Sequence, residues 1–282
     1  MSTVKINQQE LFPIGLGTWH MGEDPAKKGQ ELEALKTGIE HGAVVLDTAE
    51  MYGDGGSELL VGEALQSFNR KDLFLISKVY PWNASKKQLP VSLDNSLKRL
   101  GTDYLDLYLL HWTGNVPIEE TIEAMEEAKK AGKIKAWGVS NFDVKDLEKM
   151  YQKENSQNCQ VNQVLYNLGE RGIEFDLLPF MQEKQLPLIA YAPMAEGDQL
   201  GGQLTSNAKL KEIAQNHQAT VFQMLLAWSI RKGQTLAIPQ SSNPEHVIEN
   251  IEAAQIQLTD EEMKQLDKEF PKPTSKQTLS II

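Results

Sequence analysis

The chain has 282 residues, of which 40% are hydrophobic and 24% are charged, and its formal net charge is −11. This acidity argues against a nucleic-acid-binding protein, and no apolar run approaches the about 18 residues of a membrane span. The single cysteine, Cys159, excludes an intramolecular disulfide and a cysteine metal cage, and the N-terminus shows no secretory signal. We therefore expect a cytoplasmic globular protein without a bound metal.

Short apolar runs alternate with helical stretches along the whole chain. Runs rich in Val, Ile and Leu predict eight strands, over Ile14–Thr18, Val44–Asp47, Leu73–Lys78, Tyr104–His111, Ile134–Ser140, Gln160–Gln163, Pro187–Tyr191 and Thr235–Pro239. Such continuous apolar runs are typical of parallel strands that are buried on both faces. Between them, helical spacing predicts helices that include Glu31–His41, Leu89–Leu100, Thr121–Ala131 and Thr220–Arg231.

A glycine stands at the end of these four helices, shortly before the next strand: Gly42, Gly101, Gly132 and Gly233. Glycine adopts the left-handed backbone of a helix C-terminus without a steric clash. Strands that alternate with helices through short joints imply a parallel sheet, and eight such units favour a closed (β/α)8 TIM barrel over an open doubly wound sheet. No linker or composition step divides the chain, so we expect residues 1–282 to form a single domain.

Two segments depart from this regular alternation. Residues Pro193–Leu204 are rich in glycine and predict a long loop after the seventh strand, and long loops in compact domains are usually functional or disordered. Residues Pro271–Ile282 carry two prolines and follow the last expected helix, so they predict a C-terminal tail.

The expected strands end in polar or aromatic side chains, at Asp47, Lys78, His111, Ser140, Asn141, Gln163 and Tyr191. A barrel enzyme places its chemistry at this end of its strands. Buried Asp and Lys are rare unless paired, so we expect Asp47 and Lys78 to form an ion pair at the barrel mouth. Taken alone, Asp47 could cap a helix, Lys78 could reach water, and His111 could be a structural hydrogen-bonding group. Their joint occurrence at one rim favours a catalytic site.

Ordered motifs through nearly the whole chain resemble those of the aldo-keto reductases. The motifs are GLGTW (Gly15–Trp19), LDTAEMYG (Leu46–Gly53), ISK (Ile76–Lys78), LLHW (Leu109–Trp112), GVSNF (Gly138–Phe142), NQ (Asn162, Gln163), AYAP (Ala190–Pro193) and IPQSSNPEHVIEN (Ile238–Asn250). Within the family, VYPWNAS (Val79–Ser85) and LYNLGERGIEFDLLP (Leu165–Pro179) are most similar to the bacterial branch with methylglyoxal reductase activity.

The resemblance implies a catalytic tetrad of Asp47, Tyr52, Lys78 and His111, with a nicotinamide cofactor across the barrel mouth. Hydride would pass to a carbonyl carbon while Tyr52 gives its proton to the developing alkoxide. A lysine about 4 Å away supplies about 4 kcal/mol at an effective dielectric of 20, enough to move a tyrosine pKa from about 10 toward 7. We therefore expect Lys78 to lower the pKa of Tyr52, Asp47 to hold Lys78 and partly offset this shift, and neutral His111 to position the substrate. Taken alone, Tyr52 could be a packed loop aromatic.

The resemblance also implies a set of cofactor contacts. Ser140, Asn141 and Gln163 would bind the carboxamide, and Tyr191 would stack on the nicotinamide, for which core packing is the alternative. The loop after the seventh strand would fold over the pyrophosphate. The further expected contacts are Gly17, Thr18, Trp19, Asp47, Ala192, Pro193, Met194, Ile238, Gln240, Ser241, Ser242, His246, Glu249 and Asn250.

The segment expected at the adenosine phosphate departs from the family pattern. Members that prefer the phosphorylated cofactor usually carry a Lys and an Arg where this chain has Gln240 and His246. Gln240 adds no charge, and a histidine is cationic for only part of the time at neutral pH. We expect NADPH as the cofactor, with NADH as the alternative. The spacing of Gly15, Gly17 and His20 gives no G-x-G-x-x-G, so a Rossmann fold is unsupported.

The expected substrate residues are Trp19, Tyr52, Trp82, His111 and Trp112, with His20 and Met21 beside the first of them. Apolar pocket walls favour small aldehydes and ketones. In the family the C-terminal tail closes this pocket, but here it is short and lacks aromatic residues. We therefore expect an open pocket under the tail that takes several small carbonyl compounds, methylglyoxal among them.

Two other functions stay open at this stage. Some family members serve as redox-sensing regulatory subunits that bind the cofactor, and an intact tetrad does not exclude that role. An isomerase or aldolase on the same barrel would need a Schiff-base lysine or a phosphate site, because fold alone does not set chemistry. Family resemblance also makes a monomer the expected oligomeric state.

Overall fold

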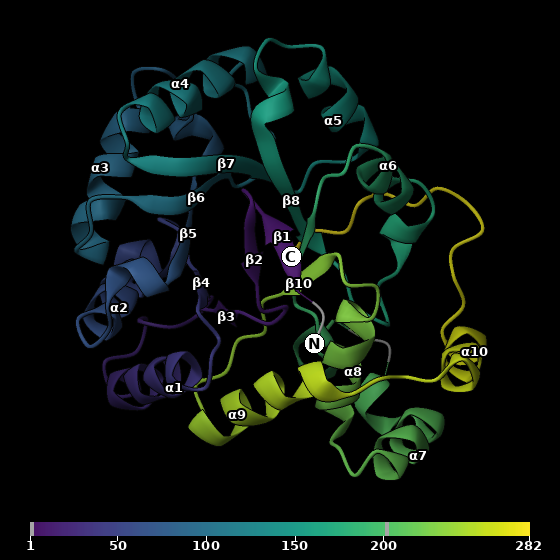
Figure 1. Cartoon of the computed structure of the whole chain (residues 1–282). Helices are drawn as coiled ribbons and strands as arrows, with labels where there is room; N and C mark the ends of the chain where they lie inside the picture. The colour runs from purple at the N-terminus through teal and green to yellow at the C-terminus, as the bar shows by residue number, and fades with distance from the viewer. Residues whose placement is uncertain (1–2, 201–202) are drawn as a thin grey trace.

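The computed structural model describes residues 3–200 and 203–282, and its centre is a sheet of parallel strands (Figure 1). The strands are β3 (Leu16–Gly17), β4 (Val45–Asp47), β5 (Phe74–Val79), β6 (Leu105–Leu110), β7 (Ile134–Ser140), β8 (Cys159–Leu165), β9 (Leu188–Tyr191) and β10 (Thr235–Ala237). Each lies on one of the expected runs and pairs with its neighbours in chain order.

The sheet closes between its first and last strands. Ile14 forms a parallel bridge with Ala237, the Gly15 amide donates to the Ala237 carbonyl at 2.8 Å, and the Gly17 amide donates to the Pro239 carbonyl at 2.9 Å. The predicted (β/α)8 barrel is therefore confirmed. Its interior is filled by apolar side chains that include Phe74, Leu107 and Leu236.

Helices surround the barrel in Figure 1 and cover the outer faces of its strands. They are α1 (Lys28–Glu40), α2 (Gly56–Leu65), α3 (Leu89–Leu100), α4 (Ile118–Lys130), α5 (Val144–Tyr151), α6 (Leu177–Glu183), α7 (Ala208–Asn216), α8 (Val221–Ile230), α9 (Pro244–Glu252) and α10 (Asp260–Glu269). The four expected helices correspond to α1, α3, α4 and α8. The glycines after them have φ angles of +96°, +64°, +76° and +68°, as a left-handed helix end requires.

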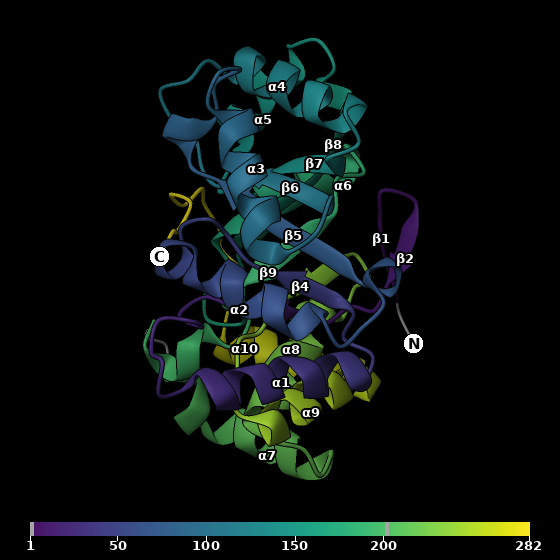
Figure 2. The same ribbon diagram turned by 90° about the vertical axis from the view of Figure 1, so that its left-hand side faces the viewer.

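An antiparallel hairpin that the sequence patterns did not predict precedes the barrel. Its strands β1 (Val4–Ile6) and β2 (Gln9–Leu11) are joined by two residues with positive φ, which is the geometry of a tight hairpin turn. Val4, Ile6 and Leu11 pack with the side chains of the barrel interior. Figure 2 shows the hairpin on the side of the barrel opposite the C-terminus.

The chain returns to the mouth of the barrel after α10. Residues 271–282 leave α10 and run back to the middle of the barrel in Figure 1, and Ile282 lines the cavity there. The predicted tail over the pocket is therefore confirmed. The expected loop after β9 forms a short turn at Ala195–Asp198, while its residues 201–202 lie outside the described part of the chain. Within the described ranges, no helix is long and apolar enough to cross a membrane.

Candidate active site

A cavity of about 470 Å³ opens at the carboxyl ends of the barrel strands. Most of the residues that the sequence assigned to the site contribute to its lining. These are Gly17, Thr18, Trp19, Asp47, Tyr52, His111, Ser140, Asn141, Gln163, Tyr191, Ala192, Pro193, Met194, Ile238, Gln240, Ser241, His246, Glu249 and Asn250. Barrel closure thus gathers residues from positions 17 to 250 around one space.

An ion pair lies at the base of this cavity. Asp47 ends β4, Lys78 lies in the neighbouring β5, and the Lys78 Nζ is 2.5 Å from the Asp47 carboxylate. Both side chains are almost completely buried, at 0% and 2% exposed for Lys78 and Asp47. The Lys78 Nζ also donates to the Thr48 carbonyl at 2.9 Å and to the Tyr52 hydroxyl at 3.1 Å. The expected ion pair at the barrel mouth is confirmed.

The other Asp47 carboxylate oxygen accepts a hydrogen bond from the Gln163 side-chain amide at 2.7 Å. Thr18 donates to the Asp47 carbonyl through both its amide, at 3.1 Å, and its hydroxyl, at 2.9 Å. A buried charge pair is tolerated only when its remaining hydrogen-bonding capacity is satisfied. The Gln163 amide and the Thr48 carbonyl meet this demand at the charged atoms, and Thr18 fixes the backbone of Asp47, so the ion pair is held in a single arrangement.

Tyr52 reaches Lys78 from the loop after β4. The three residues that follow it, Gly53, Asp54 and Gly55, all have left-handed backbone angles. They form a tight turn that leads directly into α2. The ring of Tyr52 lies edge-on to that of His111, with ring centroids 5.8 Å apart. The turn therefore brings the phenol over the ion pair although Tyr52 belongs to no strand.

The expected lowering of the Tyr52 pKa is wrong. Burial raises the pKa of Tyr52 above its ordinary value, and this effect exceeds the lowering that Lys78 causes. Asp47 also raises it. The expectation balanced Lys78 against Asp47 alone and left out the cost of removing a phenolate from water. Tyr52 is therefore protonated at neutral pH.

His111 is held neutral by its surroundings. Burial, followed by the nearby positive charge of Lys78, lowers the pKa of the His111 imidazole to about 2. Its Nδ1 is buried and makes no hydrogen bond to the described residues, which carries a free-energy cost in a folded protein. The side-chain amide of Asn141 donates to the backbone carbonyl of His111 at 3.2 Å and so connects the segments that follow β6 and β7. The expectation that His111 is neutral agrees with this lowered pKa.

The ends of β7, β8 and β9 form a hydrogen-bonded cluster beside His111. The Ser140 hydroxyl and the backbone amide of Asn141 both donate to the backbone carbonyl of Gln163 at 2.9 Å. The Tyr191 hydroxyl donates to the Asn141 side-chain oxygen at 2.9 Å. Asn141 has a φ of +57°, a conformation that asparagine adopts more readily than other non-glycine residues. This cluster sets amide and hydroxyl groups beside the aromatic ring of Tyr191.

The far end of the cavity is formed by β10 and α9. Gln240 and His246 are exposed there, next to Ser241, Glu249 and Asn250. None of the described residues that line the cavity is a lysine or an arginine. A phosphate at this end would therefore be met by amides, hydroxyls and imidazole instead of by a permanent positive charge.

Four expected residues do not line the cavity: Lys78, which is buried against Asp47 and Tyr52, and then Trp82, Trp112 and Ser242. Trp82 is 61% exposed and stacks on Tyr80 with centroids 4.3 Å apart, and Trp112 lies edge-on to Trp82 and 4.8 Å from the His111 ring. These tryptophans form an aromatic group beside the cavity. Ser242 also lies outside the lining, so the roles assigned to Trp82, Trp112 and Ser242 stay predictions.

The cavity also contains residues that the motifs did not assign to it. Met51, Phe222 and Pro239 line it, as do Glu196, Gly197 and Gln199 of the loop that was expected over the pyrophosphate and Ile282 of the expected tail. Met51 adjoins Tyr52 and could have been found from that neighbour. Phe222 lies in the first turn of α8 and is 40% exposed. In the sequence, an apolar residue at helical spacing predicts a position in the hydrophobic core instead. Nothing local in the sequence brings Phe222 to the site, whereas Ile282 belongs to the tail that was expected there.

Comparisons with known proteins agree with this site. The family model for the Aldo/keto reductase family matches residues 13–269. The Escherichia coli methylglyoxal reductase YeaE is 47% identical over 272 residues, which cover 96% of this chain and 95% of that protein. The Bacillus subtilis glyoxal reductase is 33% identical over 268 residues, covering 94% of this chain and 91% of that protein.

Solved structures give the same result. A Klebsiella pneumoniae aldo/keto reductase in complex with NADP and acetate has 47% sequence identity and a TM-score of 0.98, and the match covers 100% of this chain and 99% of that one. A structure from the same organism in complex with NADPH matches equally well. The chain belongs to the aldo/keto reductase family and is therefore an oxidoreductase.

Proposed function

We propose that this chain uses NADPH to reduce small aldehydes and ketones of the methylglyoxal type. The observation that carries the proposal is a protonated Tyr52 hydroxyl in the wall of a cavity of about 470 Å³. This hydroxyl lies 3.1 Å from the buried Lys78 ammonium. This volume lies within the about 300–1,000 Å³ range of ligand pockets. The names of the Escherichia coli and Bacillus subtilis relatives describe those proteins, and they support a small dicarbonyl as the substrate here.

When bound, the nicotinamide cofactor would supply the hydride that the carbonyl carbon receives. Tyr52 would give its proton to the carbonyl oxygen as charge develops there, which leaves a phenolate. The Lys78 ammonium, held by Asp47 at 2.5 Å, would stabilise this phenolate through the 3.1 Å hydrogen bond. A raised pKa suits this direction of reaction, because Tyr52 then carries its proton before every turnover.

His111 would position the carbonyl oxygen. A neutral imidazole donates a hydrogen bond without adding a proton that competes with that of Tyr52. The edge-on contact of the two rings brings His111 and Tyr52 to the same part of the cavity.

The cavity residues suit a nicotinamide dinucleotide. The amide and hydroxyl groups of Ser140, Asn141 and Gln163 would hold the carboxamide, and the Tyr191 ring would cover one face of the nicotinamide. The loop after β9 would lie over the pyrophosphate, and the residues from Gln240 to Asn250 would bind the adenosine phosphate. We propose NADPH over NADH because the homologous Klebsiella structures contain NADP and NADPH.

The direct test compares the wild-type protein with Tyr52→Phe by absorbance at 340 nm, with methylglyoxal and each cofactor. We expect the wild type to oxidise NADPH faster than NADH, and the variant to lose about 100-fold or more in kcat, which is the size of a general acid's contribution. Its cofactor affinity, measured by tryptophan fluorescence quenching, should stay within about twofold because the phenol oxygen is not a proposed cofactor contact.

Near-normal turnover by Tyr52→Phe would contradict the proposed role of Tyr52. Cofactor binding without reduction of any of a panel of aldehydes and ketones would favour the redox-sensing subunit instead. Faster use of NADH would keep the reductase and overturn the choice of cofactor.

We further propose that residues 1–282 act as one domain in a cytoplasmic monomer. Closure of the barrel between its first and last strands supports one domain. The single, buried Cys159 is compatible with a reducing compartment. Light scattering should give a mass near 31.6 kDa, and a value near twice that would contradict the monomer.

A further inference from the structure

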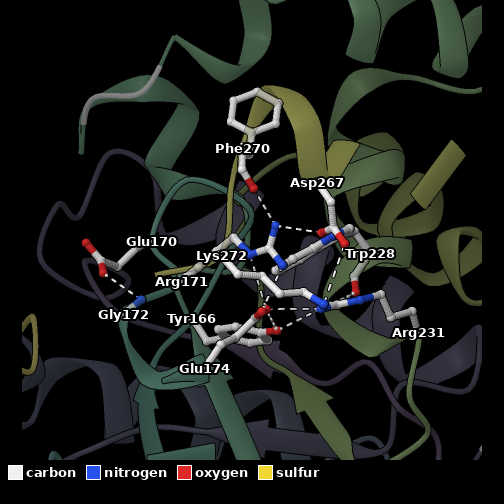
Figure 3. Close-up of polar contacts among 10 residues, drawn as sticks. All are labelled: Tyr166, Glu170, Arg171, Gly172, Glu174, Trp228, Arg231, Asp267, Phe270 and Lys272. Carbon is white, nitrogen blue, oxygen red and sulfur yellow. Dashed lines mark hydrogen bonds and ion pairs between the residues drawn. The ribbon is translucent and has the colours of Figure 1, made fainter. Parts of the chain in front are cut away.

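The C-terminal tail begins at a buried ionic network, which Figure 3 shows. The Arg171 guanidinium lies between Glu174, at 2.8 Å, and Asp267 of α10, also at 2.8 Å, and it donates to the Phe270 carbonyl at the end of α10. Arg231 reaches the same Glu174 from the end of α8 at 3.1 Å. The point where the tail leaves α10 is therefore firmly attached to the loop after β8.

Beyond this point the tail has few buried contacts. Its residues are mostly exposed, and Leu279 is the partly buried apolar residue of residues 271–282 that packs against the core. Gln277 lies over Gly172, where an added Cβ would be 3.0 Å from the Gln277 side-chain oxygen. Segments with little buried apolar area are the ones that open most easily in folded proteins. A specific polar contact is thus needed to keep this tail in one place.

Lys276 makes that contact. Its Nζ lies 2.5 Å from Asp143, just after β7, and 2.9 Å from Asp176, just before α6. Burial lowers the pKa of Lys276, but its hydrogen bonds to the two carboxylates prevail and raise it above the ordinary value. One side chain of the tail therefore joins two loops on the active-site face of the barrel.

Six residues further on, the tail reaches the wall of the cavity beside Tyr191. Ile282 lines the cavity together with Tyr52 and Tyr191. Hydrogen bonding to the Ile282 backbone also opposes the rise that burial causes in the pKa of Tyr191. The same Tyr191 lies close enough to Tyr52 for the two groups to interact electrostatically, so a shift of the tail at Lys276 would move the cavity wall next to both tyrosines.

We propose that Lys276 is a positioning residue that clamps the tail to Asp143 and Asp176 and thereby places Ile282 against the bound carbonyl substrate. This inference rests on the proposed function, since it assigns the Tyr52 end of the cavity to the carbonyl. Lys276 is 42% exposed, and exposed ion pairs weaken as salt screens them. The clamp can therefore be released while the barrel stays folded.

The test uses Lys276→Met with saturating NADPH and methylglyoxal as the varied substrate. We expect the KM to rise about threefold to tenfold, the kcat to change less than about twofold, and Lys276→Arg to restore most of the wild-type KM. Asp176→Asn should reproduce the loss, because among the described residues Lys276 is the one polar partner of the Asp176 side chain, whereas Asp143 also caps α5. The matched control is Lys272→Met, which removes a tail lysine that pairs with Asp267 at 3.5 Å.

Salt gives a second readout that a merely structural residue would not produce. Methylglyoxal is uncharged, so raising the ionic strength should raise the wild-type KM toward that of Lys276→Met through the clamp. The KM of the variant should not change with salt. A parallel salt dependence in both proteins would overturn the proposal.

Amide hydrogen exchange tests the clamp independently of activity. Exchange at residues 277–282 should be faster in Lys276→Met than in the wild type, and unchanged in Lys272→Met. Unchanged exchange in Lys276→Met, or faster exchange with an unchanged KM, would overturn the inference. Faster exchange in a protein whose wild type reduces no carbonyl would support the clamp and overturn the proposed function alone.

Discussion

In the proposed mechanism, Tyr52 keeps its proton until the carbonyl oxygen receives it. Burial raises its pKa, and the Lys78 ammonium at 3.1 Å opposes this without reversing it. A developing alkoxide is a far stronger base than a phenolate, so proton transfer does not need a neutral pKa. In this mechanism Lys78 would stabilise the phenolate after the transfer, where the buried surroundings strengthen the interaction.

His111 should make the fold sensitive to acid. Its pKa of about 2 lies below the about 6.5 of an unfolded histidine, so between these values the unfolded chain binds more protons. Stability contributed by the neutral ring is therefore present above about pH 6.5 and is lost as the pH falls, by up to about 1.4 kcal/mol per unit. In urea unfolding from pH 7 to 4, His111→Gln should show a shallower loss of stability than the wild type. Equal slopes would contradict this assignment.

Gln240 should limit the preference for NADPH. Adding a positive charge beside a 2′-phosphate, as in Gln240→Lys, should tighten NADPH binding about tenfold and leave NADH unchanged, because an exposed charge-assisted contact is worth about 1–2 kcal/mol. Fluorescence titration of both cofactors measures this. Gln199→Lys is the matched control: it lines the cavity from the loop after β9 and should affect the two cofactors equally. An unchanged NADPH-to-NADH ratio in Gln240→Lys would mean that this position does not face the phosphate.

At the scale of elements, the barrel closes at a contact that only glycine permits. A Cβ on Gly17 of β3 would lie 2.6 Å from the Ile238 carbonyl, which is backbone and cannot move aside cheaply. This close approach brings β3 and the segment after β10 together at the mouth. The seam where the barrel closes is thus part of the cavity wall, since both Gly17 and Ile238 line it.

Gly17→Ala should therefore lower both stability and cofactor affinity. Overpacking of this kind costs about 1–3 kcal/mol in the free energy of unfolding, which urea titration measures. Gly29→Ala in α1 is the control: an added Cβ there meets nothing within 4 Å, and alanine should stabilise the helix by about 0.5–1 kcal/mol. Similar losses in both variants would refute the close contact as the cause.

Over the whole molecule, the two ends of the barrel have separate tasks. The β1–β2 hairpin packs Ile6 against the barrel interior on the side opposite the C-terminus, as Figure 2 shows, while the cavity and the tail occupy the other side. In barrel enzymes chemistry lies at the carboxyl ends of the strands, and the opposite end serves stability. Substitutions in the hairpin should therefore change stability without changing kcat or KM.

Ile6→Ala tests this separation. Ile6 is 1% exposed, so its truncation should cost about 2–4 kcal/mol in the free energy of unfolding. The kcat and KM for methylglyoxal should stay within about twofold of the wild type at a temperature where both proteins are folded. A large loss of kcat in a folded variant would show that the two ends are coupled.

The sequence by itself determined the barrel and the polar residues at its strand ends, while the resemblance to the aldo-keto reductases added Tyr52 and the contacts from Ile238 to Asn250. Its apolar runs, the glycines at helix ends and the polar residue at each strand end are local signals, and each lies within a few residues of the feature it predicts. The order of strands follows chain order, so the strand ends needed no further information to be placed at one rim. The sequence did not predict the β1–β2 hairpin, because its strands have three residues each and include exposed Lys5 and Glu10.

Only the tertiary structure decided the pKa of Tyr52, the position of the tryptophans beside the cavity, the arrival of Phe222 at its wall, and which residue of the expected tail lines it. Each depends on neighbours far away in the chain. Burial sums the contributions of many such residues, so the sign of the Tyr52 shift could not be read from Lys78 and Asp47 alone. The tail is placed by Arg171 and Lys276, whose partners Asp267 and Asp143 lie 96 and 133 positions away. No local sequence pattern predicts ion pairs between residues that are so far apart in the chain.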